Sequence, residues 1–524
     1  MKKSITKKYY IVASVVVVVL VTAFFIGESI IASKIENAIK TELSTQLAID
    51  YETLDLNLLK RQVVLKQIKL LPIKKEEEQD DFEVVLKKFS VRGFSIWNFL
   101  IKDKISIREI DLLHPQIVYK ISSDKEKSNT KASSAQFDKS VTVASFHIEG
   151  GVVQIYNQGV QDSLLFETTQ LNFILEQLKI DETTLQENIP FVYDDYSLTL
   201  SNLFYRLSAY ENLRLISFQS TPAETSIEDL SIHTKYSKNE LQQHIAVERD
   251  HFKIDISQLT IKEQRFGFEE DSAFFFQSSK VHIQSTNMEI YRDKLTADDE
   301  THKKLYSKML RELNIHLSLD EVVLENTAVA YSEKVNEGMD AGTVSFHKLN
   351  ATIQNLGNTY APTVKTQIDI DAIFMKQTPI EVHWAFDVHN LDDHFLFKAA
   401  LGKLPAMDMN PFSEPNLKVK LDGELLKTYF TVDGNYRTSQ IDLKMDYTDF
   451  NVDILTGDGQ RKNKFLSAIA DIFIKKDSES SEDAYREISK SDVERDPTKS
   501  VFNFLWQNIK AALLGVMTGG GSSK

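Results

Sequence analysis

After residue 48 the chain alternates apolar and polar residues with a period of two. Leu54, Leu56 and Leu58 are separated by single polar residues, and the same alternation recurs at Ile368 and Ile370. This is the period of a β-strand that buries one face. Turn-forming residues interrupt it roughly every ten to fifteen positions. The pattern predicts a mostly β protein, with an elongated, curved antiparallel sheet and few short helices.

Helical spacing of apolar residues is confined to a few stretches. Ile31, Ile35 and Ile39 begin one such run, which predicts an amphipathic helix over 28–48. The same spacing predicts three further helices, over 298–313, 460–474 and 495–518.

An uncharged, strongly apolar segment precedes the first of these helices. Tyr9 to Gly27 contains nineteen residues without a charge. A helix of that length measures roughly 28 Å, enough to cross the hydrocarbon core of a bilayer. Lysines are concentrated in residues 1–8, and the first charge after the segment is Glu28. The positive-inside rule therefore predicts a single-pass membrane anchor over 9–27, with a cytoplasmic N-terminus over 1–8 and the body outside the cytoplasm. A cleaved signal peptide is the alternative, although no small-x-small cleavage site follows.

One pattern recurs in four copies along the chain. Each copy has two alternating apolar runs around a short polar break, such as Gly150-Gly151 in one copy and Ser285–Asn287 in another. Two runs around a break are typical of two strands joined by a tight turn. Chance recurrence of a common β pattern is the alternative. The copies span residues 110–119, 146–156, 281–291 and 322–331.

Charged or Ser-rich stretches without apolar period divide the predicted β-structure. They predict linkers over 122–140 and 475–494 and a flexible tail over 519–524. Between them the sequence predicts three β-regions, which form separate domains or one continuous sheet. These regions cover residues 49–121, 141–297 and 314–456.

Composition narrows the function classes. The formal net charge is −15, so nucleic-acid binding, which depends on neutralising phosphates, is not expected. The absence of cysteine excludes disulfides and zinc–thiolate sites. Hydrolase, zinc-protease and nucleotide-binding motifs are missing, so no enzyme activity, cofactor or metal is expected. The cluster of His389, Asp392, Asp393 and His394 fits no standard zinc spacing and is interpreted as a solvated turn.

The predicted strands carry more apolar surface than the predicted helices can cover. They therefore pack as closed sandwiches, or they form a trough with an apolar interior. Beside a bilayer an acyl chain fits such a trough, because each buried methylene contributes about 0.8 kcal/mol. An ordinary dry core is the alternative. His147 and His282 alternate with the apolar residues and are expected on the outer, solvated face. The candidate lipid-contact residues are Phe146, Ile148, Val153, Ile155, Ile283, Met288, Ile290, Leu324 and Val329.

The C-terminal helix allows two interpretations. Its apolar residues lie at helical spacing, but Asn503, Gln507 and Asn508 make it too polar to span a bilayer. It is expected either to lie on a membrane surface or to cap the end of the sheet. The candidate membrane-interface residues are Phe502, Leu505, Trp506, Ile509 and Leu513.

Four parts of the chain resemble the AsmA-like family, relatives of the TamB and YhdP proteins of Gram-negative envelopes. They are the anchor followed by a strand pair at Ile49–Pro72, the segment ISIREIDLLHPQIVYKI at Ile105–Ile121, the stretch Gly402–Leu455 and the closing segment Arg495–Met517. The resemblance implies an elongated β-groove with an apolar lining, and a role in phospholipid traffic between the two membranes or in outer-membrane upkeep. The chain is much shorter than the long members of the family, which favours a partial bridge, an oligomer or a partner.

These observations lead to one main expectation about function. The chain is expected to bind phospholipid acyl chains in an apolar β-groove and to support lipid transport between the inner and outer membranes. The alternative is a non-enzymatic scaffold for outer-membrane protein or envelope assembly. The expected partners are the inner membrane, phospholipid, and the outer membrane or an envelope protein.

Overall fold

The computed structural model describes the chain in eight stretches, and several predicted segments lie outside them. The N-terminus over 1–8, the anchor over 9–27, the helix over 460–474 and the tail over 519–524 are not among the described residues. In the part of the chain that is described, no helix is long and apolar enough to cross a membrane. The described residues are 47–57, 60–72, 81–95, 104–121, 140–157, 164–269, 273–455 and 486–515.

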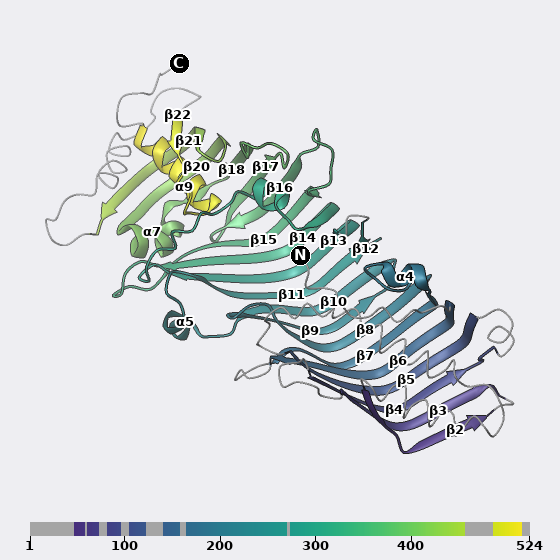
Figure 1. Cartoon of the computed structure of the whole chain (residues 1–524). Coiled ribbons are helices and arrows are strands. Elements are labelled where there is room, and N and C mark those ends of the chain that lie inside the picture. The colour runs from purple at the N-terminus through teal and green to yellow at the C-terminus, as the bar shows by residue number, and fades with distance from the viewer. Residues whose placement is uncertain are drawn as a thin grey trace. The chain divides into compact units, whose positions relative to one another are not determined.

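The described residues confirm the mostly β prediction. They contain 22 strands in open, mixed sheet structure, and the chain divides into two compact units. Unit 1 consists of Met1–Asp229 with Gly267–Ser272, and unit 2 consists of Leu230–Phe266 with Ala273–Lys524. Figure 1 labels the elements of both.

Unit 1 is a sheet of long strands with one short helix. Two strands cross the boundary with unit 2, β10 (Glu224–Thr234) and β12 (Arg265–Phe268). The other elements of unit 1 are β1 (Leu47–Asp50), β2 (Thr53–Asn57), β3 (Gln62–Pro72), β4 (Asp81–Arg92), β5 (Lys104–Ile121), β6 (Ser140–Asn157), β7 (Leu164–Ile180), α4 (Glu182–Gln186), β8 (Asp195–Arg206) and β9 (Glu211–Ser220).

Unit 2 continues the same architecture and adds helices that pack against the sheet. Its elements are α5 (Lys238–His244), β11 (Asp250–Lys262), β13 (Phe274–Asp293), α6 (Tyr306–Arg311), β14 (Ile315–Lys334), β15 (Gly342–Gly357), β16 (Thr366–Phe374), β17 (Thr378–Phe386), β18 (Phe395–Leu401), β19 (Leu404–Pro405), η2 (Ala406–Met409), α7 (Asn410–Leu417), β20 (Val419–Gly434), β21 (Thr438–Ile454), β22 (Arg486–Glu494) and α9 (Val501–Gly515).

The four repeat copies do not form hairpins, so that prediction is wrong. Each copy lies within one continuous strand: β5, β6, β13 or β14. Strands β5 and β6 pair in parallel, and so do β13 and β14. Equivalent repeat positions face each other in both pairs, since Ile110 pairs with Phe146 and Val281 pairs with Val322. The other strand pairs with a described register are antiparallel.

The polar break in each copy is a kink in a continuing strand. One residue of each break has positive φ: His114, Gly150, Ser285 and Asn326. A two-residue hairpin of the commonest type requires positive φ at both central positions. A single such residue produces a bulge, which bends the strand without ending it.

The bulge at Gly150 gives a test of this geometry. Gly150 has φ +65°, and a Cβ placed there would meet the imidazole of His114 at 2.5 Å. Gly150→Ala is expected to destabilise unit 1 by about 1–2 kcal/mol, because alanine is strained at this φ. Gly338→Ala is the control, since only Asn336 comes near a Cβ there. Urea unfolding of both variants measures the difference, and equal stability of the two would contradict the bulge.

Three predicted boundaries are also corrected. The helix predicted over 298–313 is reduced to α6, because Lys303 N donates to Pro497 O at 2.7 Å in a non-helical segment. The predicted linker over 475–494 contains β22, whose charged residues hide its strand pairing with β21. The helix predicted over 28–48 ends too late, since Leu47 begins β1.

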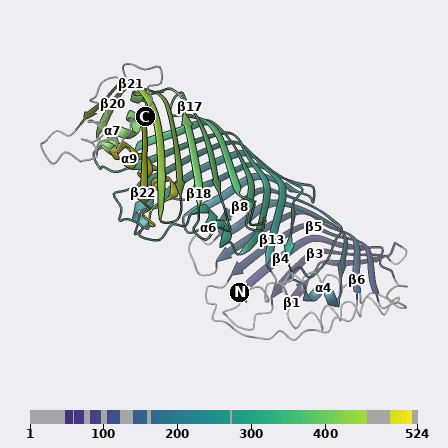
Figure 2. The same ribbon diagram turned by 90° about the horizontal axis from the view of Figure 1, so that it is seen from above.

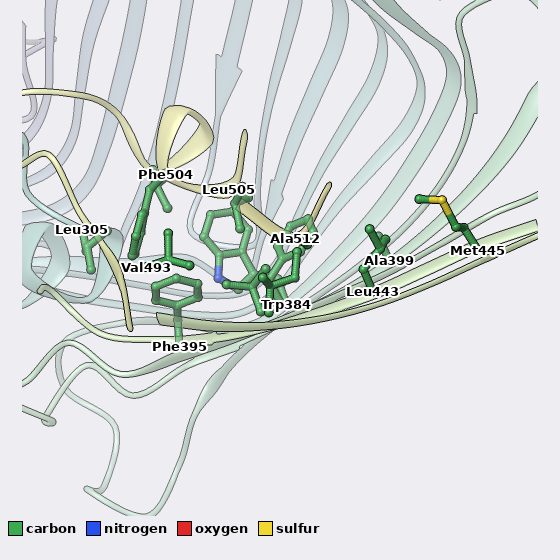
Figure 3. Packing of buried hydrophobic residues seen from close by; sticks show 14 of the residues in the cluster. Leu305, Trp384, Phe395, Ala399, Leu443, Met445, Val493, Phe504, Leu505 and Ala512 are labelled. Atoms are coloured by element: carbon green, nitrogen blue, oxygen red, sulfur yellow. The ribbon is translucent and has the colours of Figure 1, made fainter. Parts of the chain in front are cut away.

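Each unit has its own hydrophobic core on one face of its sheet. In unit 1 the core is formed by β3–β7, with Ile105, Ile110 and Val143 fully buried. In unit 2 it is formed by β17–β22 with α9, which contacts β21 and β22 (Figures 1 and 2). Figure 3 shows Phe504, Leu505 and Ala512 of α9 above Phe395 and Leu443 of the sheet. The predicted C-terminal helix is therefore present, as α9, and packs on the sheet.

Candidate functional site

The apolar face of unit 1 continues across seven strands. Residues that pair across neighbouring strands project from the same face of a sheet. One such cross-strand row is apolar from β2 to β8. It consists of Leu54, Leu65, Phe89, Leu112, Ile148, Phe173 and Leu198.

Unit 2 contains a longer apolar row, which we call row B. It crosses ten strands from β11 to β22 and contains no polar residue. A second row beside it includes Val281, Trp384 and Ile441. Row B consists of Leu259, Ile283, Leu324, Ala351, Ile370, Val382, Ala399, Phe430, Leu443 and Ile488.

The register places all nine predicted lipid-contact residues on these apolar faces. Phe146 is buried in the unit 1 core. The other eight are half-buried: Ile148, Val153 and Ile155 in unit 1, and Ile283, Met288, Ile290, Leu324 and Val329 in unit 2. Half-burial of a large apolar side chain in mid-strand means that its neighbours in the sheet flank it while its outer side stays accessible. These side chains are thus available to an apolar ligand.

Helical segments cover part of each face. In unit 1, Leu185 of α4 and the following Phe191 and Tyr193 pack against the core beside β7. In unit 2, α9 covers the face at β21 and β22, where Leu443 is only 2% exposed. The row B residues in β11, β13 and β14 are half-buried, whereas Leu443 beneath α9 is almost fully buried. Both parts of row B are apolar, so they differ in whether a helix covers them and not in residue type.

The predicted membrane-interface residues divide between the core and the surface. Leu505 is buried in the unit 2 core, and Trp506, Ile509 and Leu513 are partly buried against it. Phe502 is 60% exposed. The packing of α9 corresponds to the capping interpretation, and of the five residues Phe502 is the one that a membrane surface could reach without movement of the helix.

The polar face of unit 1 carries a connected cluster that sequence reasoning missed. Asp111 is its centre, with its side chain 11% exposed. Its Oδ2 accepts from Ser90 Oγ at 2.6 Å and from Arg92 Nη2 at 2.7 Å. Its Oδ1 lies 3.2 Å from His147 Nδ1, and His147 Nε2 lies 2.7 Å from Ser145 Oγ. We call these residues, with Glu109 and Glu176, the Asp111 cluster.

Opposing effects act on the pKa of Asp111. Burial raises it, but the hydrogen bonds from Ser90 and Arg92 and the charge of Arg92 together outweigh burial, so the pKa lies below its ordinary value. The carboxylate is therefore ionised, and its charge is compensated within the sheet.

The Asp111 cluster also has the composition of a cation site. Glu109, Asp111 and His147 offer ligand atoms within 4.8 Å of one another. Arg92 Nη2, however, contacts both carboxylates, at 2.5 Å from Glu109 and 2.7 Å from Asp111. The guanidinium supplies the positive charge that a metal would bring, so the arrangement is that of a structural ion-pair network. Asp111 and His147 occupy equivalent repeat positions, a signal that could have placed them together had parallel pairing been known.

In the second repeat pair, the histidine equivalent to His147 is His282, and Val323 stands where the first pair has Asp111. His282 Nε2 lies 2.9 Å from Glu325 Oε2. Both predicted outward-facing histidines, His147 and His282, are on the polar side of their strands and opposite the apolar rows. The predicted side of the strand agrees with the register, but both side chains are half-buried and not fully solvated.

The histidine–aspartate cluster near residue 390 is not a single site. His394 Nε2 lies 2.8 Å from Asp433 Oδ1, and His389 Nε2 lies 2.9 Å from the Tyr360 carbonyl oxygen. Asp393 is buried, contrary to the prediction of a solvated turn, and accepts from Ser307 Oγ and Arg311 Nη2. It anchors α6 to the sheet, so the three side chains serve different contacts.

No family model and no curated protein matches this chain.

Proposed function

We propose that this chain is an inner-membrane-anchored periplasmic protein of the AsmA-like type, whose apolar β-face binds phospholipid acyl chains and supports their movement between the inner and outer membranes. Row B carries the proposal. Its ten apolar positions follow one another on ten strands. Strands about 4.8 Å apart give such a row a length of roughly 40–45 Å.

A surface of this kind suits a ligand that slides. Each methylene placed against it contributes about 0.8 kcal/mol, with no hydrogen bond that must be broken before the chain moves on. Along row B every side chain is apolar, and Glu289 pairs with Lys253 across the strands on the opposite face. An acyl chain that lies along row B therefore meets no charged side chain.

A charge on the apolar face tests the proposal. Ile148→Asp and Ile290→Asp are each expected to reduce the phospholipid that co-purifies with the full chain by about tenfold or more, because an acyl chain cannot solvate a buried carboxylate. Mass spectrometry after gentle purification measures the lipid. Val323→Asp is the control, since Val323 is also half-buried but pairs with His282 on the polar face.

The same experiment separates the scaffold alternative. Wild-type protein that purifies without phospholipid, with both variants as stable as the control, would refute the conduit and leave the scaffold. Thermal unfolding of all four proteins excludes a trivial loss of lipid through misfolding.

A further inference from the structure

Helix α9 covers an apolar surface that continues beyond it. Beneath the helix Val432 and Ile441 are fully buried and Leu443 is 2% exposed. On the same face Ile283, Leu324 and Ile370 are half-buried. The covered and uncovered residues belong to the same cross-strand rows, so the sheet offers one kind of surface and α9 occupies one end of it (Figure 3).

The attachment of α9 is polar at its start. Lys499, two residues before the helix, lies 3.5 Å from Glu248 Oε1 and 3.1 Å from Asp298 Oδ2. The Glu248 side chain is 2% exposed and also pairs with Lys294 Nζ at 2.6 Å. Arg495 donates to the Lys303 carbonyl oxygen. We call these contacts the strap. They tie the segment before α9 to the connection between β13 and β14 and to Glu248, which lies between α5 and β11.

The body of α9 is held mainly by apolar packing. Phe504 and Ala512 are buried against the sheet. In the buried middle of the helix, Ser439 Oγ of β21 donates a hydrogen bond to Asn508 Oδ1 at 2.8 Å. Asn508 Nδ2 donates within the helix, to the Phe504 carbonyl oxygen. The body of α9 is thus held to the sheet mainly by side chains that an apolar ligand could replace, while the strap holds the segment before the helix.

Trp384 lies where the cover begins. Its ring contacts Phe502 of α9 edge-on, with centroids 6.3 Å apart. It also lies edge-on to Phe397 and at a tilt to Tyr306. Trp384 is 5% exposed, and its indole Nε1 has no hydrogen-bond partner in the described structure. A buried indole N–H usually has an acceptor, and leaving it without one costs about 1–3 kcal/mol.

We propose that the face beneath α9 is a second acyl-chain site, which α9 occupies in this structure and vacates by swinging about the strapped segment 495–500. This inference rests on the proposed function and specifies where lipid enters or leaves the row. When an acyl chain takes the place of α9 on the sheet, one apolar occupant replaces another, so the change in buried apolar surface is small. A glycerol ester carbonyl at the edge of the site would accept the Trp384 N–H, which selects an esterified lipid.

A reversible disulfide tests the proposal directly, because the natural chain has no cysteine. Ser439→Cys with Asn508→Cys joins α9 to β21 at two side chains already in contact. Ser332→Cys with Thr343→Cys is the matched control, a cross-strand pair in unit 2 away from α9. Both pairs are placed in a chain with Trp97→Phe and Trp506→Phe, so that Trp384 is the sole tryptophan.

Quenching of Trp384 fluorescence reports contact with lipid. The full-length proteins are reconstituted in vesicles of phosphatidylcholine with brominated acyl chains and compared with unbrominated vesicles. We expect Trp384 to be quenched in the reduced protein. Oxidation of the 439–508 pair is expected to reduce this quenching at least about fivefold, and added reductant is expected to restore it. The oxidised 332–343 control is expected to be quenched like the reduced protein.

A second variant acts in the opposite direction. Ser439→Ala removes the hydrogen bond to Asn508, which exists only while α9 covers the sheet, and quenching is expected to become several-fold faster. Two results would refute the acyl-chain site beneath α9 and leave the proposed function intact. One is equal quenching of the oxidised and reduced 439–508 protein. The other is no quenching of Trp384 in any form while phospholipid still co-purifies with the wild type. Absence of phospholipid from every form would overturn both.

Discussion

Asp111→Ala is expected to destabilise unit 1 by about 3–5 kcal/mol, because removing one member of a buried ion-pair network leaves its partners unpaired. Arg92 would lose its contact with the Asp111 carboxylate, and Ser90 would lose its acceptor. The side chain is only 11% exposed, so water cannot replace the lost contacts freely. Urea unfolding, followed by hydrogen exchange in β4–β7, measures the loss.

The control for this change is another aspartate that pairs with a histidine across strands. Asp255 lies 2.8 Å from His233, but its side chain is 44% exposed. Asp255→Ala is expected to cost less than about 1 kcal/mol, as exposed ion pairs do. Similar losses for Asp111→Ala and Asp255→Ala would show that the Asp111 cluster is not a buried network.

Low pH is expected to weaken the contribution of the Asp111 cluster to the stability of unit 1. The pKa of Asp111 is below its ordinary value in the folded protein. Its contribution to stability is therefore present above the unfolded-state pKa of about 3.9 and is lost as the pH falls through the folded pKa. Wild-type unit 1 is expected to lose more stability below about pH 4 than the Asp111→Ala variant. Parallel pH profiles for the two proteins would refute this.

Ile110→Ala is expected to destabilise unit 1 by about 2–5 kcal/mol, through lost apolar burial and the cavity left behind. Ile110 is fully buried and pairs with Val91 on one side and with Phe146 on the other. It is thus at the centre of the parallel repeat pair, where the surrounding strands cannot collapse easily into a cavity. Urea unfolding with the same hydrogen-exchange readout measures the effect.

Ile216 provides the comparison, since it is also an isoleucine in a strand of unit 1 but is 56% exposed. Ile216→Ala is expected to change stability by less than about 0.5 kcal/mol. If the two alanine variants are equally stable, the core of unit 1 does not lie on the face that the strand register assigns to it.

Local pattern was enough to predict much of this fold. A period of two places alternate residues on opposite faces of any strand, whatever that strand pairs with. Ile283 and Ile290 are seven residues apart and share a face only because of the bulge at Ser285. On one side of a bulge the period is sufficient, so Phe146 and Ile148 share the apolar face and His147, between them, lies on the polar one. The C-terminal helix was visible for the same reason, because helical period depends on neighbours a few residues apart.

Pairing and cover depended on contacts between residues far apart in the chain. The break at Gly150 is compatible with a hairpin or a bulge, and the parallel contact with β5 accompanies the bulge. Asp111 looks like an ordinary solvated residue until β4 and β6 bring Ser90, Arg92 and His147 to it. Burial of row B beneath α9 likewise requires residues 501–515 to return to β21 and β22. Alternation along a strand depends on backbone geometry within that strand. Strand partners, ion pairs and the covering of the sheet by α9 depend on which distant segments meet, and the periodicity of the sequence does not specify those segments.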